Sequence, residues 1–359
     1  MKGYHMESTF EQYRKVYEML EDGPSRDIYL NRLNYMISRD KRYIEAIVKA
    51  YLPGVPYFTG KTPADLRAAM PNDRKIVLYG AGVAGKIILP YWKDDERFIG
   101  FCSQTKEKQK NGYCGWPVMS PEELLARKDL NVVISTTMAD REIKQILEAG
   151  GYPWDQVYSL IGYYKYEDPE QYFAPDFMSY GEQEVLIDAG CLNLASTLEF
   201  KKHCKSVKKV YAFEPDPECY QICLERKRRK ALSEVELLPY GVWSERTRLH
   251  FSARADGSSQ VSEVGCSSVQ LVPIDEVVPE EERVTMIKMD IEGSELEALK
   301  GAKRVIQRDK PKLAICIYHK PEDMTAIPLY IKRLVPDYKL YVRHHSNYGN
   351  ETVLYAVMA

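Results

Sequence analysis

The sequence of 359 residues lacks any apolar run that approaches the roughly 18 residues a membrane span requires. Its first residues, Met1 to Ser8, contain no apolar signal core, so we expect a cytoplasmic protein without a membrane partner. The formal net charge is only -2 at pH 7, which gives no global field that would attract nucleic acid. Nucleic-acid and membrane binding are therefore excluded from the expected functions.

Cysteine is present but unpatterned, because none of the eight cysteines forms a Cys-x-x-Cys pair. Several lie in apolar strand or helix patterns, among them Cys191, Cys223 and Cys316. Scattered cysteines in such positions are typical of reduced structural thiols. We therefore predict neither a disulfide framework nor a cysteine-based zinc site, and we assign no residue to a metal site.

The remaining pattern divides the chain into four parts. Residues 1–72 have helical periodicity and form an N-terminal helical segment. Residues 73–162 and 181–359 alternate strand and helix patterns, which predicts two Rossmann-like parallel-sheet domains of α/β class. Residues 163–180 are rich in tyrosine, contain Pro169 and Pro175, lack periodicity, and are predicted to be a linker.

The first α/β domain carries a glycine motif. Gly80-Ala-Gly-Val-Ala-Gly85 follows the apolar stretch 75–79 and precedes a helical pattern, the context in which Gly-x-Gly-x-x-Gly binds a dinucleotide. The next strand, however, runs into Cys102-Ser103-Gln104 and offers no acid for a ribose. Two readings stay open: a nucleotide-sugar or NAD(P) site, or glycines that serve only helix–strand packing.

The second domain contains more predicted strands and helices than the first. Its predicted strands and helices are strand 184–189, helix 195–203, strand 209–213, helix 217–230, strand 235–242, an inserted pair 248–251 and 268–272 around Asp256-Gly257, strand 285–290, helix 295–307, strand 312–318, helix 323–334, and a hairpin of 338–345 with 352–357. A closing antiparallel hairpin on a parallel sheet is typical of class I methyltransferases that use S-adenosylmethionine (SAM), and a plain dinucleotide domain lacks it.

Polar residues at successive strand ends predict the cofactor site. Asp188 and Gly190 follow the first strand of this domain, and Glu214 follows the second. A glycine turn lets a ligand approach the backbone, and an acid after the next strand accepts hydrogen bonds from a ribose diol. The turn is not Gly-x-Gly-x-x-Gly, so we predict SAM, which has no phosphate. Pro239-Tyr240-Gly241-Val242 ends the third strand and would either frame the adenine or serve packing, and Pro215 beside the acid is also predicted to contact the cofactor.

The next two strand ends predict the reacting groups. Asp290 and Glu292 follow the fourth strand, where Asp290 also faces the cofactor, and His319 follows the fifth. Methyl transfer to an alcohol needs the oxygen held at about 3–3.5 Å and a base for its proton. His319, with an ordinary pKa of about 6.5, is the predicted base and Asp290 its rival. The two acids can instead hold a substrate hydroxyl or a hard cation such as Mg²⁺.

These motifs resemble the FkbM-type methyltransferase family. The similar stretches are Ile187-Asp-Ala-Gly190, Phe213-Glu-Pro215, Lys288-Met-Asp-Ile-Glu-Gly-Ser-Glu295, Ile317-Tyr-His-Lys-Pro-Glu-Asp323 and Thr352-Val-Leu-Tyr355. The resemblance covers the second domain, about half the chain. It implies SAM-dependent O-methylation of a hydroxyl on a small molecule, a sugar or glycan, or a secondary metabolite, and it leaves a homodimer open.

One position departs from the family pattern. Where the family usually has a second glycine after the first motif, this chain has Leu194. A side chain there would crowd the methionine tail of SAM unless the turn follows another path. The sequence therefore leaves open a degenerate SAM site, with function carried by the Gly80 to Gly85 loop.

Overall fold

The structure is a computed structural model that describes residues 9–53, 55, 57–136, 140–160, 163, 165–252, 260–261 and 267–358. The chain forms two compact units. Unit 1 contains residues 1–40, 167–345 and 350–359, and unit 2 contains residues 41–166 and 346–349. Within the described part of the chain, no helix combines the length and the apolar character needed to cross a membrane.

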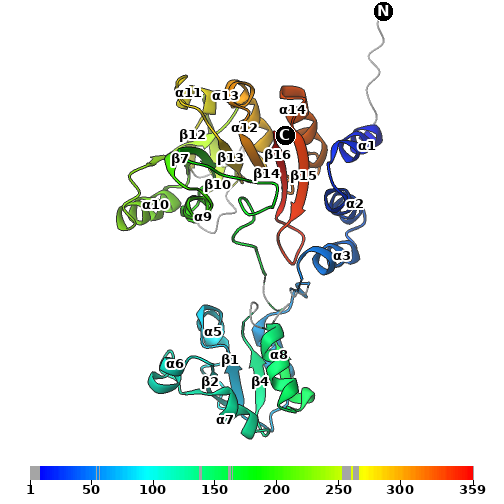
Figure 1. The fold of residues 1–359 in the computed structure, drawn as a ribbon, viewed down its shortest axis with the longest axis vertical. Helices are drawn as coiled ribbons and strands as arrows, with labels where there is room; N and C mark the ends of the chain where they lie inside the picture. The colour runs from blue at the N-terminus through cyan, green and yellow to red at the C-terminus, as the bar shows by residue number, and fades with distance from the viewer. Residues whose placement is uncertain are drawn as a thin grey trace, which may run out of the picture. The chain divides into compact units, whose positions relative to one another are not determined.

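Unit 1 is built on a sheet of seven strands (Figure 1). Its described elements are α1 (Thr9–Met19), α2 (Gly23–Ser38), β6 (Glu184–Ala189), α9 (Ala195–His203), β7 (Val207–Phe213), α10 (Pro217–Arg229), β8 (Val235–Leu238), β9 (Gly241–Val242), β10 (Thr247–Ser252), β11 (Gln260–Val261), β12 (Ser267–Val272), α11 (Ile274–Val277), β13 (Met286–Met289), α12 (Glu295–Lys300), α13 (Lys303–Asp309), β14 (Lys312–Cys316), α14 (Asp323–Leu334), β15 (Lys339–His344) and β16 (Thr352–Val357).

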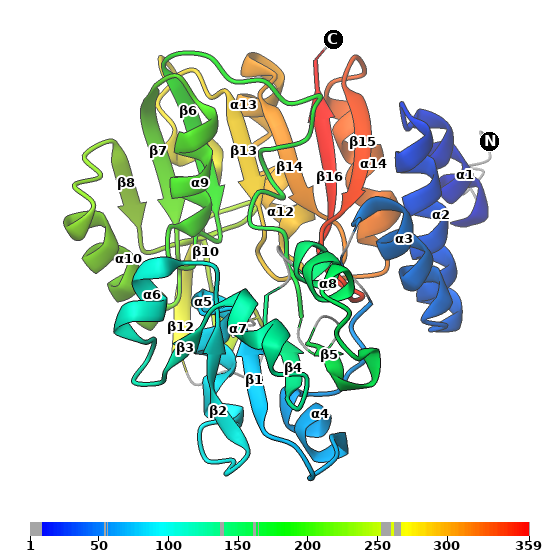
Figure 2. The ribbon, with the colours of Figure 1, turned by 60° about the horizontal axis from the view of Figure 1, so that its bottom comes forward.

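The strand order of this sheet is β15-β16-β14-β13-β6-β7-β8. The five strands from β14 to β8 pair in parallel, whereas β16 is antiparallel to β14 and β15 is antiparallel to β16. Figure 2 shows α9 in front of β6 and β7, so this helix covers these two strands on one side. The predicted parallel sheet with a closing antiparallel hairpin is confirmed.

Two predicted elements of unit 1 differ in the structure. The strand expected over 235–242 ends at Leu238, and β9 joins a separate four-stranded sheet of order β11-β10-β12-β9. The helix expected over 295–307 is divided into α12 and α13. It breaks at Gly301, where a Cβ would lie 1.9 Å from the carbonyl oxygen of Trp243, so the helix surface closely approaches another segment. Asp256 and Gly257 lie outside the described residues.

The segment expected as a linker packs as part of unit 1. Residues 165–180 form no helix or strand, as their lack of periodicity predicts. From Glu167 onward they nevertheless belong to unit 1, and Tyr172, Phe173 and Met178 are buried in the hydrophobic core beneath β6, β7 and β14. Aromatic side chains therefore hold this stretch to the sheet without regular backbone hydrogen bonding.

Helices α1 and α2 also pack within unit 1. Helix α2 lies beside β15, the edge strand of the sheet (Figure 1). Arg343 on β15 pairs with Asp22, the N-cap of α2, at 2.6 Å, and Ser25 accepts from the backbone N–H of Val342 at 2.9 Å. Covering an edge strand in this way protects its unpaired backbone groups from association with other chains.

Unit 2 is a smaller parallel α/β unit with strand order β3-β2-β1-β4-β5. Its described elements are α3 (Arg42–Tyr51), α4 (Pro63–Ala69), β1 (Ile76–Tyr79), α5 (Val83–Ile88), the 3₁₀ turn Leu89–Tyr91, β2 (Phe98–Cys102), α6 (Lys106–Asn111), β3 (Val118–Met119), α7 (Pro121–Ala126), β4 (Asn131–Ile134), α8 (Asp140–Ala149), the 3₁₀ turn Trp154–Gln156 and β5 (Val157–Ser159). All four strand pairings are parallel, so the Rossmann-like class predicted for this part is confirmed.

Candidate active site

The predicted residues gather along one edge of the seven-stranded sheet. Asp188 lies near the end of β6, Glu214 follows β7, Asp290 follows β13 and His319 lies shortly beyond β14. These four strands are neighbours and run in parallel, so their carboxyl ends meet at the same edge. Open α/β sheets bind their ligands at this edge.

Glu214 is held at the end of β7 by two backbone donors. Its Oε2 accepts from the N–H of Leu192 at 2.9 Å, and its Oε1 accepts from the N–H of Asp216 at 2.9 Å. The side chain therefore connects the turn after β6 to the start of α10. Burial raises the pKa of Glu214 to about 7, against the opposing effect of the two backbone donors. Each carboxylate oxygen retains a lone pair for a further donor.

The turn after β6 depends on Gly190. Its φ is 72°, and a Cβ at this position would lie 1.9 Å from the carbonyl oxygen of Asp290, so only glycine fits. Leu194 also has a left-handed backbone, with φ 62°. Its side chain is fully buried in the hydrophobic core with Cys191 and Phe200. The turn therefore directs the Leu194 side chain into the core. A side chain buried there would not crowd the methionine tail of SAM.

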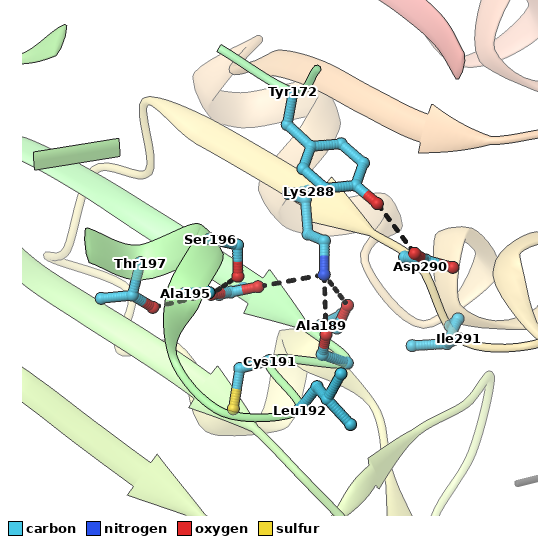
Figure 3. A network of polar contacts seen from close by, with 12 residues as sticks. Tyr172, Ala189, Cys191, Leu192, Ala195, Ser196, Thr197, Lys288, Asp290 and Ile291 are labelled. Atoms are coloured by element: carbon cyan, nitrogen blue, oxygen red, sulfur yellow. Dashed lines mark hydrogen bonds and ion pairs between the residues drawn. The ribbon is translucent and has the colours of Figure 1, made fainter. Parts of the chain in front are cut away.

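A buried polar network links β6, β13 and the segment before β6 (Figure 3). Lys288 Nζ lies 3.3 Å from Asp188 Oδ1 and donates to the carbonyl of Gly190 at 2.7 Å. Asp188 Oδ2 accepts from the hydroxyls of Ser196 at 2.7 Å and Thr197 at 2.6 Å. Burial lowers the pKa of Lys288, but the negative charges of Asp188 and Asp290 outweigh it and raise that pKa overall. Lys288 thus fixes the Gly190 turn against the sheet.

Tyr172 extends this network to Asp290. Its ring lies 5.1 Å from Lys288 Nζ, and its hydroxyl donates to Asp290 Oδ2 at 2.8 Å. The sequence does not predict a role for Tyr172, because this residue lies in an aperiodic stretch where no pattern shows which way a side chain points. A buried polar role for Lys288 could be predicted from the sequence, because Lys288 is the one charged residue in the apolar strand Met286–Met289.

The structure brings Asp290, Glu292 and His319 together. One ligand atom from each lies within 4.8 Å of the others. His319 Nε2 lies 3.4 Å from Asp290 Oδ1 and 3.7 Å from Glu292 Oε2, and its Nδ1 lies 3.0 Å from Glu295 Oε1. Burial lowers the pKa of His319, but Glu295 and the other carboxylates more than compensate and raise it to about 9. The raised pKa favours the protonated form of the ring, which leaves Asp290 as the other candidate base.

The predicted adenine frame is partly assembled. Gly241 lies in β9, paired with Leu271 of β12, and a Cβ at Gly241 would lie 3.8 Å from the Cβ of Pro215. Pro215 and Gly241 are therefore neighbours, although they come from different segments. Val242 is buried beside Gly241 in the same strand.

The glycine loop of unit 2 has a clear packing role. A Cβ at Gly85 would lie 2.1 Å from the carbonyl oxygen of Gly80, so this glycine allows α5 to approach the end of β1. The loop carbonyls of Ala81 and Gly82 accept from Lys108 Nζ and from the Tyr113 hydroxyl, respectively. These contacts favour helix–strand packing as the reason for the glycine motif.

Comparison with known proteins agrees with the fold. The strand order, the closing hairpin and the acids at the strand ends define a class I methyltransferase fold. Residues 187–340 of unit 1 match the family model described as Methyltransferase FkbM domain, as the sequence motifs predicted.

One curated relative is the hexuronic acid methyltransferase AglP of Haloferax volcanii, which is 33% identical over 109 residues. That alignment covers 29% of this chain and only 45% of the relative. A crystal structure of methyltransferase FkbM from Methylobacillus flagellatus KT is 21% identical, with a TM-score of 0.44, over 88% of this chain and 98% of that one. A putative methyltransferase from Streptococcus mutans in complex with SAH is 17% identical, with a TM-score of 0.33, over 49% of this chain and 89% of that one.

Proposed function

We propose that the chain is a SAM-dependent O-methyltransferase that acts on a hydroxyl of a sugar, a glycan or a related small molecule. The observation that carries this proposal is that Glu214 lies beside the Gly190 turn at the same sheet edge as Asp290, Glu292 and His319, with β6 between its strand β7 and β13. Binding residues and reacting residues would then share one sheet edge. The relative that modifies a hexuronic acid supports a sugar acceptor.

The residues of the sheet edge fit SAM. Glu214 Oε1 and Oε2 each accept one backbone N–H, which aims the carboxylate and leaves lone pairs for the two hydroxyls of a ribose. Gly190 lets the ligand approach the backbone, and the buried position of Leu194 removes its side chain from the turn surface. Pro215 and Gly241 would border the adenine.

When bound, SAM supplies a methyl group on a positively charged sulfur. The chain's own residues would position the acceptor and provide the charged groups around it. The cluster of Asp290, Glu292 and His319 would hold the acceptor oxygen at about 3–3.5 Å from the methyl carbon. A carboxylate of this cluster would take the hydroxyl proton, and Tyr172, which donates to Asp290 Oδ2, would fix the direction of that carboxylate. A positioned base contributes about 10²–10⁴ in rate.

Calorimetric titration with S-adenosylhomocysteine (SAH) tests the proposal. We expect one site per chain, and we expect Glu214→Gln to weaken binding by about 10- to 100-fold, because hydrogen bonds to a charged group contribute about 1.5–3 kcal/mol. The matched control is Glu236→Gln on β8, which removes a carboxylate from the neighbouring strand. No binding at millimolar SAH, or equal loss in both variants, would contradict the proposal.

A further inference from the structure

The cluster of Asp290, Glu292 and His319 has the composition of a cation site. Two carboxylates and one imidazole converge, with their ligand atoms within 4.8 Å of one another. Neighbouring ligands of a divalent ion with bonds of about 2.1–2.6 Å lie about 3.0–3.7 Å apart. The distances from His319 Nε2 to Asp290 and Glu292, 3.4 and 3.7 Å, fall within this range.

The histidine points independently to a ligand at this cluster. Its side chain is only 7% exposed, yet Nε2 has no hydrogen bond of acceptable geometry to any described residue. A buried polar group without a hydrogen bond costs about 1–3 kcal/mol. Nε2 lies 3.4 Å from Asp290 Oδ1 and 3.7 Å from Glu292 Oε2, so one cation could be shared by the three groups.

Glu295 is placed as an outer partner of the histidine. It is fully buried, its Oε1 lies 3.0 Å from His319 Nδ1, and the same oxygen accepts from the N–H of Ile291 at 2.9 Å. Histidines that bind metals usually present their second nitrogen to such a carboxylate, which fixes the ring orientation. Glu295 therefore holds the ring so that Nε2 faces Asp290 and Glu292.

The backbone between the two acids and α12 has an unusual conformation. Glu292 has φ 55° and Gly293 has φ 91°, a left-handed pair that reverses the chain directly after β13. A left-handed conformation costs roughly 1–2 kcal/mol for a residue other than glycine. Asp290 is held by two tyrosines, because its Oδ2 accepts from Tyr172 at 2.8 Å and its Oδ1 accepts from the hydroxyl of Tyr318 at 3.4 Å. The same Oδ1 lies 3.4 Å from His319 Nε2, so the carboxylate stays close to the histidine.

We propose that Asp290, Glu292 and His319 bind one divalent cation, with water and the acceptor hydroxyl in the remaining coordination positions. Two oxygen ligands against one nitrogen favour a hard ion such as Mn²⁺ or Mg²⁺. Binding of the cation stands on the geometry alone, whereas contact with the acceptor hydroxyl rests on the proposed function. A coordinated hydroxyl would lose its proton more readily to a neighbouring carboxylate.

Electron paramagnetic resonance of free Mn²⁺ during titration of the chelator-treated protein measures this site directly. We expect one saturable site in the wild type and at least a 10-fold weaker one in Glu292→Gln and His319→Ala. Glu295→Gln should weaken it by about 10- to 100-fold through the ring orientation. His203→Ala is the matched control, because His203 lies 3.3 Å from Glu199 but has a single carboxylate beside it.

The outcome separates this inference from the proposed function. Circular dichroism of each variant first establishes that it folds, and Glu292→Gln is the safest of them, since its side chain is 27% exposed. Wild-type protein without a saturable Mn²⁺ site, or Glu292→Gln with unchanged affinity, would overturn the cation site even if SAH binds. Glu214→Gln should lose SAH affinity and keep Mn²⁺ affinity. If this variant loses affinity for both SAH and Mn²⁺, the cation does not bind independently of the cofactor site, which would argue against a separate cation site.

Discussion

Glu214, the proposed ribose ligand, lies in an environment that is unusual for a carboxylate. Burial raises its pKa to about 7, so the side chain changes from a neutral acid to a carboxylate across the physiological range. Only the carboxylate accepts hydrogen bonds with both oxygens. We therefore expect SAH affinity to rise with pH through 7 and to be about 10-fold weaker at pH 6 than at pH 8.

Calorimetry at pH 6, 7 and 8 measures this dependence. Glu214→Gln has no titrating group at this position, so its affinity should be low and nearly constant over the same range. A wild-type affinity that stays flat from pH 6 to pH 8 would show that Glu214 does not accept from the ligand in its charged form.

Leu194 yields a prediction about stability. Its side chain is fully buried with Cys191 and Phe200, while its backbone is left-handed. Leu194→Gly would remove a buried side chain, which for Leu→Ala costs about 2–5 kcal/mol, and would relieve backbone strain of roughly 1–2 kcal/mol. We expect a lower midpoint in thermal unfolding and an unchanged SAH affinity. Tighter SAH binding by this variant would place Leu194 at the ligand after all.

The sequence could predict those site residues that end strands. Asp188, Glu214 and Asp290 follow apolar strand patterns, and parallel strands bring their ends to one edge. Tyr172 and Glu295 were not predictable in the same way. The direction of Tyr172 depends on packing of an irregular segment, and the role of Glu295 depends on a helix start that points back to His319.

At the scale of elements, β13 is the strand that organises the site. It lies between β6 and β14, and it carries Lys288, whose charge is buried between Asp188 and the Gly190 turn. Removing one partner of a buried ion pair typically costs about 3–5 kcal/mol, because the other charge stays buried. Lys288→Met keeps the length of the side chain and removes only its charge. We expect it to destabilise unit 1 by about that amount.

Urea unfolding followed by circular dichroism compares this variant with Lys209→Met on β7. Lys209 pairs with Glu236 at 2.8 Å, but its side chain is 32% exposed, and such exposed pairs contribute about 0–1 kcal/mol. Equal midpoints for the two variants would mean that the buried pair has little net effect on stability. A loss confined to Lys288→Met would establish that the network of Figure 3 fixes the turn to the sheet.

The limits of prediction at this scale have a common cause. The break between α12 and α13 falls at Gly301, which closely approaches Trp243, and α2 covers β15 through contacts between residues more than 300 positions apart. Helical periodicity reports which face of a helix is apolar, but it does not report which distant segment will meet that face. Both features depend on tertiary packing, so a local pattern cannot reveal them.

At the scale of the whole molecule, the chain contains two α/β units, and Asp188, Glu214 and Asp290 at the strand ends belong to unit 1. Our proposal assigns the cofactor to unit 1. Hydrogen exchange with and without SAH tests that assignment, since ligand binding slows local opening near its site. We expect slower exchange in residues 189–194, 213–216 and 290–295, with no change in residues 76–89.

The same experiment with NAD(P) or UDP-sugars tests the alternative reading of the Gly80 to Gly85 loop. The packing of Gly85 against Gly80, and the use of the Ala81 and Gly82 carbonyls by Lys108 and Tyr113, predict no protection there. Protection of residues 76–89 by a nucleotide, without protection of unit 1 by SAH, would transfer the cofactor function to unit 2. Protection by both ligands, each in its own unit, would instead give the chain two independent nucleoside sites and leave the methyl-transfer proposal standing, because the strand ends that bind SAH and the glycine loop share no residue.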